Sequence, residues 1–95
     1  MKPLPPTIHL IRTSAFADNK LQLCIDTLGV NDELFLLDDG TYNVNHALLT
    51  NLSNPVYVLD EHLTSRAVSA AEFEVINYVD LVQATVKAGK VITWQ

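Results

Sequence analysis

Cys24 is the only cysteine in the sequence, and its thiol is the only side chain with distinctive covalent chemistry. A thiol reacts as the thiolate, which a helix N-terminus or nearby cations favour. Cys24 gains little from either, because it lies beyond the first turn of a helix expected over residues 20–28 and close to Asp26. Its spacing from Leu21 and Leu28 places it on the apolar face of that helix. Two interpretations follow: a small buried hydrophobic residue, or a sulfur-accepting thiol that reacts only when a partner binds.

A second group of chemically able side chains follows the most apolar stretch of the chain. Residues 34–37 contain no polar side chain, which is typical of a strand buried on both faces. The strand ends at Asp38-Asp39-Gly40, and open α/β sheets place their sites at the C-terminal ends of central strands. The two carboxylates could act as acid and base or bind a cation, although adjacent residues at a strand end point in different directions. A simple turn at the glycine is the alternative, so we treat Asp39, Gly40 and Tyr42 as a candidate ligand or interface loop.

Trp94 lies on the last expected strand, Lys90–Trp94. Its side chain could fill the core and hold this strand in place, as large aromatic residues often do. It could instead anchor an interface, because tryptophan is enriched at interaction hot spots. The three tyrosines allow the same two interpretations. An acidic domain of this size with exposed aromatic residues fits an assembly better than a protein that works alone.

The sequence gives no support to several other kinds of site. With only three glycines it has no dinucleotide-binding loop and no phosphate-binding loop. A single cysteine excludes an internal disulfide and a Cys-His zinc cluster. His9, His46 and His62 lack the spacing of metal ligands, so we expect no metal and no cofactor. We expect His62 to be a solvated side chain on a short exposed helix.

Composition indicates one globular domain over residues 1–95, with 48% hydrophobic residues. The net charge is −5, and the six Lys and Arg residues form no basic run. We therefore expect no direct contact with nucleic acid or with an acidic membrane. Residues 1–6 hold three prolines and predict an extended lead-in, neither a signal peptide nor a membrane span. The cysteine content suits a reducing cytoplasm.

Short β-rich runs alternate with helical runs along the chain. The expected strands are residues 7–11, 34–37, 56–59, 73–76 and 90–94. The expected helices are residues 20–28, about 44–52, about 60–66 and 78–87. The last helix is capped by Asn77 and has Val79, Val82 and Val86 on one face. This order predicts a small single-domain α/β fold, with a mostly parallel five-stranded sheet and helices on both faces.

Four stretches spread over nearly the whole chain form a recognisable pattern. They are residues 32–40 with Tyr42, residues 56–59 with Asp60 and Arg66, residues 76–82 with Val91 and Trp94, and residues 9–16. In their order and spacing they resemble the DsrH/TusB family, part of the DsrE/DsrF/DsrH-like group of small sulfur-relay proteins. Two positions depart from that pattern. The family often has Arg-Gly at Arg66-Ala67, and Gln-Asp-Gly at Asp38-Asp39-Gly40.

The resemblance implies a compact DsrE/F/H-like α/β domain in a cytoplasmic heterohexamer, with two copies each of this subunit and of TusC-like and TusD-like subunits. In the TusB branch the complex passes persulfide sulfur from a TusA-like donor to a TusE-like acceptor, for 2-thiolation of the tRNA wobble uridine. In the DsrH branch the related complex serves sulfur oxidation. The main sulfur-carrying cysteine belongs to the TusD- or DsrE-like subunit. Cys24 falls where DsrH-type members carry a helix cysteine, whereas some TusB-type members have an apolar residue there.

Three functional hypotheses follow. The first is a TusB-like subunit of the tRNA thiolation relay that acts as a non-catalytic or accessory part of a sulfurtransferase complex. The second is a DsrH-like subunit of a DsrEFH complex in sulfur oxidation, with Cys24 as the catalytic, transiently persulfidated thiol. The third is a stand-alone α/β ligand-binding module whose site is the loop at residues 39–42.

Overall fold

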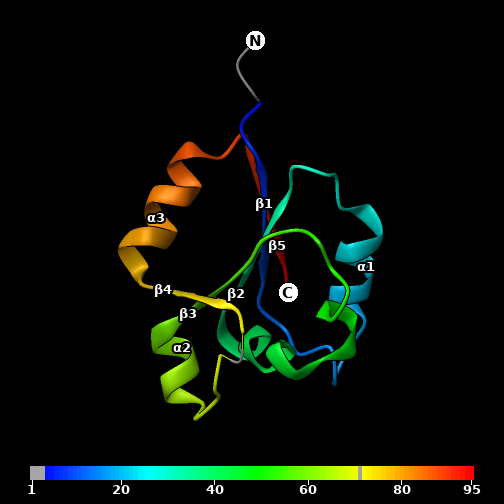
Figure 1. Cartoon of the computed structure of the whole chain (residues 1–95), viewed down its shortest axis with the longest axis vertical. Helices are drawn as coiled ribbons and strands as arrows, with labels where there is room; N and C mark the ends of the chain where they lie inside the picture. The colour runs from blue at the N-terminus through cyan, green and yellow to red at the C-terminus, as the bar shows by residue number, and fades with distance from the viewer. Residues whose placement is uncertain (1–3, 71) are drawn as a thin grey trace.

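The computed structural model describes residues 4–70 and 72–95, and these residues form one five-stranded sheet. The strands are β1 (Thr7–Ile11), β2 (Glu33–Leu36), β3 (Val56–Leu59), β4 (Glu74–Ile76) and β5 (Lys90–Trp94). They lie in the order β4-β3-β2-β1-β5, and every pairing between neighbours is parallel. The predicted α/β fold with a parallel sheet is therefore confirmed, as Figure 1 shows.

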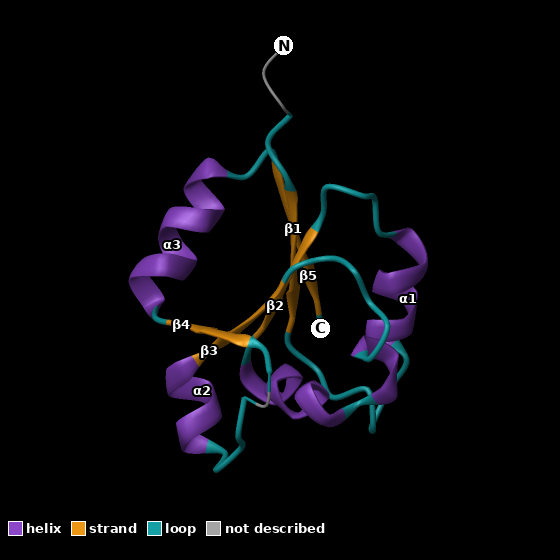
Figure 2. Cartoon of the chain, viewed as in Figure 1, coloured by secondary structure: helices purple, strands orange, loops and turns teal. Residues whose placement is uncertain are grey.

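Helices cover the two faces of the sheet unequally. The helical segments are α1 (Lys20–Thr27), the 3₁₀ segments η1 (Asp38–Asn45) and η2 (Ala47–Leu49), α2 (Asp60–Ser65) and α3 (Tyr78–Lys87). From β1 to β4 the chain adds strands in one direction, so right-handed crossovers place α1, η1, η2 and α2 on one face. Only the connection from β4 back to β5 reverses direction, which places α3 on the opposite face. Figure 2 shows α3 and α1 on opposite sides of the sheet.

The prediction of a helix over residues 44–52 is wrong. The chain forms 3₁₀ turns over η1 and η2 instead. Polar side chains in η1 bond to nearby backbone, which competes with regular α-helix: Thr41 Oγ1 donates to the carbonyl of Asp38. The fully buried amide of Asn43 donates to the Thr13 carbonyl and accepts a bond from the Ala15 N–H. These bonds hold η1 against the loop that follows β1.

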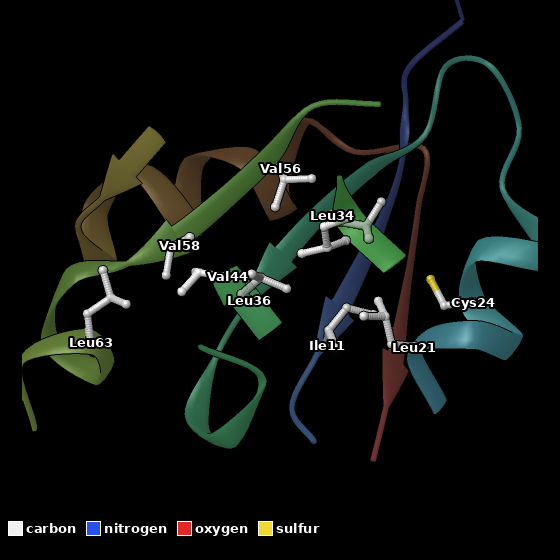
Figure 3. Close-up of a cluster of buried hydrophobic side chains, with 10 residues drawn as sticks. Ile11, Leu21, Cys24, Leu34, Leu36, Val44, Val56, Val58 and Leu63 are labelled. Carbon is white, nitrogen blue, oxygen red and sulfur yellow. The ribbon is translucent and has the colours of Figure 1, made fainter. Parts of the chain in front are cut away.

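The larger hydrophobic cluster lies on the face covered by α1 (Figure 3). The smaller cluster lies under α3 and consists of Ile8, Phe35, Leu37, Leu59 and Ile76. The helix α3 packs Leu81, Ala84 and Ala88 against this smaller cluster, and none of its residues is fully buried. The sheet side of α3 is thus made mostly of small residues, which leaves that face of the sheet thinly covered.

The three valines of α3 face away from the sheet. Val79, Val82 and Val86 are 62%, 58% and 78% exposed. The helix has the predicted bounds, and Asn77 forms a capping box with Asp80. Its valine face is nevertheless an outer surface, because a second apolar face of the same helix contacts the sheet.

Two further expectations concern the N-terminus and membranes. Residues 4–6 form neither helix nor strand, and the side-chain amide of Asn31 donates to the Leu4 carbonyl. Residues 1–3 of the expected lead-in lie outside the described residues. In the part of the chain that the structure describes, no helix has the length and apolar character needed to cross a bilayer.

Candidate functional site

The thiol of Cys24 is completely buried on the inner side of α1. Figure 3 shows it projecting from α1 at the end of the larger cluster, close to Leu21. Desolvation by burial, and secondarily the negative charge of Asp32, raise the pKa of the thiol to about 12. At neutral pH the group is therefore a protonated thiol without access to solvent, which is the environment of a structural cysteine.

The loop after β2 makes a sharp turn that brings it against β1. Asp38 adopts φ = 50°, a left-handed conformation that aspartate tolerates better than most residues. A Cβ atom at Gly40 would lie 1.9 Å from the carbonyl oxygen of Ile11, so no side chain fits there. Gly40 is thus required by a close approach of two backbones, and it is buried.

A chain of polar contacts begins at Asp38. The Nε of Arg12 donates to the Asp38 carboxylate at 2.6 Å, and the Asp38 N–H donates to Nδ1 of His62 at 2.7 Å. Because Nδ1 accepts this bond, the ring proton of a neutral His62 is on Nε2, which then donates to the hydroxyl oxygen of Tyr78 at 2.8 Å. The expectation of a solvated His62 is wrong: the side chain links η1, α2 and α3.

The neighbouring carboxylate points elsewhere, as expected for adjacent residues at a strand end. Asp39 accepts a bond of 3.0 Å from Nε of Arg66. The ring of Tyr42 is 40% exposed. In the candidate loop, Asp39 and Tyr42 therefore reach the surface, whereas Gly40 does not.

Trp94 forms a second polar chain, on the face covered by α1. Its indole N–H donates to Nδ1 of His9 at 3.0 Å, so the opposite ring nitrogen of His9 donates to the Asp32 carboxylate at 2.9 Å. Burial alone raises the pKa of Asp32, but bonds from the Gly29 N–H and from His9 outweigh it and leave that pKa below its usual value. The side chain of Trp94 is partly buried, and its hydrogen bond to His9 links β5 to β1.

The polar chain from Arg12 through Asp38 and His62 to Tyr78 was not predicted. Each of these residues lies just after a strand or at the start of the helix that follows one. Parallel strands bring their C-terminal ends to one edge of the sheet. The position of the four residues just after strands was therefore the feature of the sequence that could have predicted that they lie close together. Among residues 4–70 and 72–95, no cluster of three or more His, Cys, Asp or Glu side chains could hold a metal ion.

The outer face of α3 carries a shallow apolar hollow of about 260 Å³. Its lining is Tyr78, Val79, Val82 and Gln83. Exposed apolar surface of this kind, gathered on one helix, marks a contact surface more often than scattered single residues do. The valine periodicity was visible in the sequence, but it did not tell the inner face of the helix from the outer one.

Comparison with known proteins identifies the family. The family described as DsrH like protein, whose members work in sulfur relay with DsrE- and DsrF-like partners, matches residues 13–91. No curated protein matches the sequence significantly. The matched region contains α1 with Cys24, the loop after β2 and the whole of α3, and it ends before Trp94. Since the match covers most of the chain and the parallel α/β fold agrees with it, this chain belongs to the DsrH-like family.

Proposed function

We propose that this chain is an accessory, non-catalytic subunit of a TusBCD-like complex, which passes persulfide sulfur for 2-thiolation of the tRNA wobble uridine. The observation that carries the accessory role is the state of Cys24: buried, protonated and on the inner side of α1. Sulfur transfer requires an accessible thiolate. A DsrH-like subunit without one contributes to assembly and leaves the transfer to a thiol on another subunit.

The proposed partners are TusC-like and TusD-like subunits, in a cytoplasmic heterohexamer with two copies of each chain. A TusA-like donor delivers sulfur to the complex and a TusE-like acceptor removes it. The exposed valines of α3 support an assembled state, because they give an apolar contact surface on an acidic chain. The net charge of −5 supports a subunit that does not itself touch tRNA.

The alternative is a DsrH-like subunit of a DsrEFH complex in sulfur oxidation, with Cys24 as the persulfide carrier. The family match supports both branches equally. The carrier role requires α1 to move away from the sheet so that the thiol is exposed. The third hypothesis, a ligand site at residues 39–42, has less support, because Gly40 packs against Ile11 and Asp39 is paired with Arg66.

Co-expression with TusC-like and TusD-like subunits, followed by native mass spectrometry, tests the assembly. The proposal expects a six-chain species that contains two copies of this protein. A parallel co-expression with DsrE-like and DsrF-like subunits compares the two branches. A persistent monomer or homo-oligomer in both would contradict the subunit role.

A persulfide transfer assay on the assembled complex tests the accessory role. Cys24→Ser and Cys24→Ala are compared with the native complex, and a variant without the TusD-like cysteine serves as the inactive reference. We expect full transfer from both Cys24 variants. Loss of transfer with the six-chain species intact would show that Cys24 carries sulfur.

A further inference from the structure

The thin cover over one face of the sheet leaves an open groove of about 470 Å³ between α3 and strands β2, β3 and β4. Its apolar lining comes from Phe35, Tyr57, Val75, Ile76 and Ala84, and its carboxylates are Glu33, Glu74 and Asp80. The helix α3 faces this space with Ala84, a residue too small to fill it. The groove is therefore a consequence of the strand order, which assigns a single helix to this face.

The sheet register builds an aromatic floor with a carboxylate at its end. Phe35 is paired with Tyr57, and Tyr57 with Glu74, so the three side chains form a row across β2, β3 and β4. The two rings lie 4.9 Å apart between centroids. Glu33 lies two residues before Phe35 and so points to the same face of the sheet.

Negative charge in the groove is not neutralised by the described part of the chain. None of the ion pairs among residues 4–70 and 72–95 involves Glu33, Glu74 or Asp80. Burial raises the pKa of Glu33. Burial, and then the charges of Glu33 and Glu74, raise the pKa of Tyr57. A cation placed here would meet an aromatic ring and at least two carboxylates that form no ion pair with residues 4–70 or 72–95.

We propose that this groove receives an arginine side chain presented by a partner protein. The planar guanidinium stacks on the partly buried ring of Tyr57, which lies against the buried ring of Phe35, and donates to the carboxylates of Glu33 and Glu74. A separate chain must supply it, because both arginines of this protein, Arg12 and Arg66, are already held by Asp38 and Asp39. Val75, Ile76 and Ala84 of the groove give the residues that flank the arginine an apolar surface to pack on.

The test uses the isotopically labelled full chain and two peptides. One is N-acetyl-Leu-Arg-Leu-amide, and the other replaces arginine with citrulline, which has nearly the same shape and no charge. We expect the arginine peptide to shift the amide signals of Tyr57, Glu74, Val75 and Ala84, and to bind about fivefold or more tightly than the citrulline peptide. Equal binding of both peptides, or shifts at another surface, would overturn the proposal.

Two variants make the test specific. Glu74→Gln should remove the preference for arginine, whereas Glu61→Gln, on the exposed surface of α2, should keep it. Glu33→Gln should weaken arginine binding while unfolding at a higher denaturant concentration at neutral pH, because it removes a carboxylate whose pKa is raised by burial. Retention of the preference in Glu74→Gln, or self-association of the free chain through the groove, would contradict the assignment. The test needs no other subunit, so its outcome does not depend on the proposed relay function.

Discussion

At the scale of single residues, the surroundings of Cys24 decide its chemistry more than its identity does. A thiol whose pKa rises from 9.0 to about 12 has a thiolate fraction lower by about three powers of ten. Complete burial removes access as well. The sequence placed Cys24 on an apolar helical face, and the structure adds Asp32 as a second source of the raised pKa.

Native alkylation gives a direct check of the state of Cys24. In native buffer at pH 8 we expect iodoacetamide to react with Cys24 about a thousandfold or more slowly than in the urea-unfolded chain, because both the thiolate fraction and the access fall. The rate constants can be measured by mass spectrometry with the unfolded chain as the reference. Comparable rates in the two states would show that α1 opens readily, as the sulfur-carrier hypothesis requires.

The charge of Asp32 makes the stability of the fold depend on pH, because its carboxylate accepts a bond from His9, which in turn is bonded to Trp94 of β5. Its lowered pKa means that the folded state favours the carboxylate, so this stabilisation is present above the usual aspartate pKa and is lost as the pH falls through the lower folded value. Asp32→Asn should reduce the free energy of unfolding by ~1–2 kcal/mol at pH 7, and by progressively less toward acid pH.

Urea unfolding of wild type and Asp32→Asn, repeated from pH 7 into the acid range, measures this difference. Asp26→Asn is the matched control, because Asp26 is exposed and accepts a bond from Gln22 on the same helix. A constant difference between wild type and Asp32→Asn across the pH range would show that His9 and Gly29 do not hold the carboxylate as described.

At the scale of secondary-structure elements, the end of α2 has an unusual residue at a position that favours glycine. The N–H of Val68 donates to the Leu63 carbonyl and the N–H of Ala67 to the Thr64 carbonyl, which is the Schellman pattern that ends many helices. In that pattern the residue after the cap is left-handed, and Ala67 has φ = 53°. This conformation favours glycine, the residue that the resemblance to the DsrH/TusB family leads us to expect after Arg66.

Ala67→Gly should therefore raise the free energy of unfolding by ~0.5–1 kcal/mol, because relief of the left-handed strain exceeds the entropy that glycine adds to the unfolded chain. Denaturant unfolding measures it. Ala88→Gly is the control: Ala88 caps α3 with φ = −68°, so there the added flexibility should lower stability. Destabilisation of equal size at both positions would contradict the conformation assigned to Ala67.

At Gly40 the native residue is already the glycine that the position requires. Because a Cβ atom would lie 1.9 Å from the Ile11 carbonyl oxygen, Gly40→Ala must separate the loop from β1, at a cost of ~3 kcal/mol or more. Gly29→Ala, whose Cβ would lie 3.3 Å from the Asp32 carboxylate, requires only a small shift and should cost under ~1 kcal/mol. Similar stabilities of the two variants by thermal unfolding would argue against the close approach at Gly40.

Local sequence patterns predicted most elements and failed where polar side chains or two apolar faces intervened. The strands β1, β3 and β5 and the helix α3 have the expected bounds. The helix expected over residues 44–52 is absent, because Asn43 and Thr41 bond to backbone in 3₁₀ turns. Periodicity also found the valines of α3, but it could not show that alanines and a leucine face the sheet instead.

At the scale of the whole molecule, the strand order explains both candidate contact surfaces. The parallel sheet was predictable from the alternation of strands and helices, whereas the order β4-β3-β2-β1-β5 was not, since it depends on where α3 returns the chain. That order also brings Arg12, Asp38, His62 and Tyr78 together from separate elements. It leaves α3 alone on one face, with an acidic groove beneath the helix and valines outside it.

The outer face of α3 gives the last prediction. Val82 is 58% exposed and at the centre of the valine face, so Val82→Asp should leave the isolated chain as stable as wild type, within ~0.5 kcal/mol. A buried, unpaired carboxylate is costly at an apolar interface, so the same change should abolish the six-chain species in native mass spectrometry. Leu23→Asp is the matched control, because Leu23 is 45% exposed on α1, across the sheet. Assembly that survives Val82→Asp and fails with Leu23→Asp would contradict this prediction. It would instead place the partner on α1, the helix that carries Cys24.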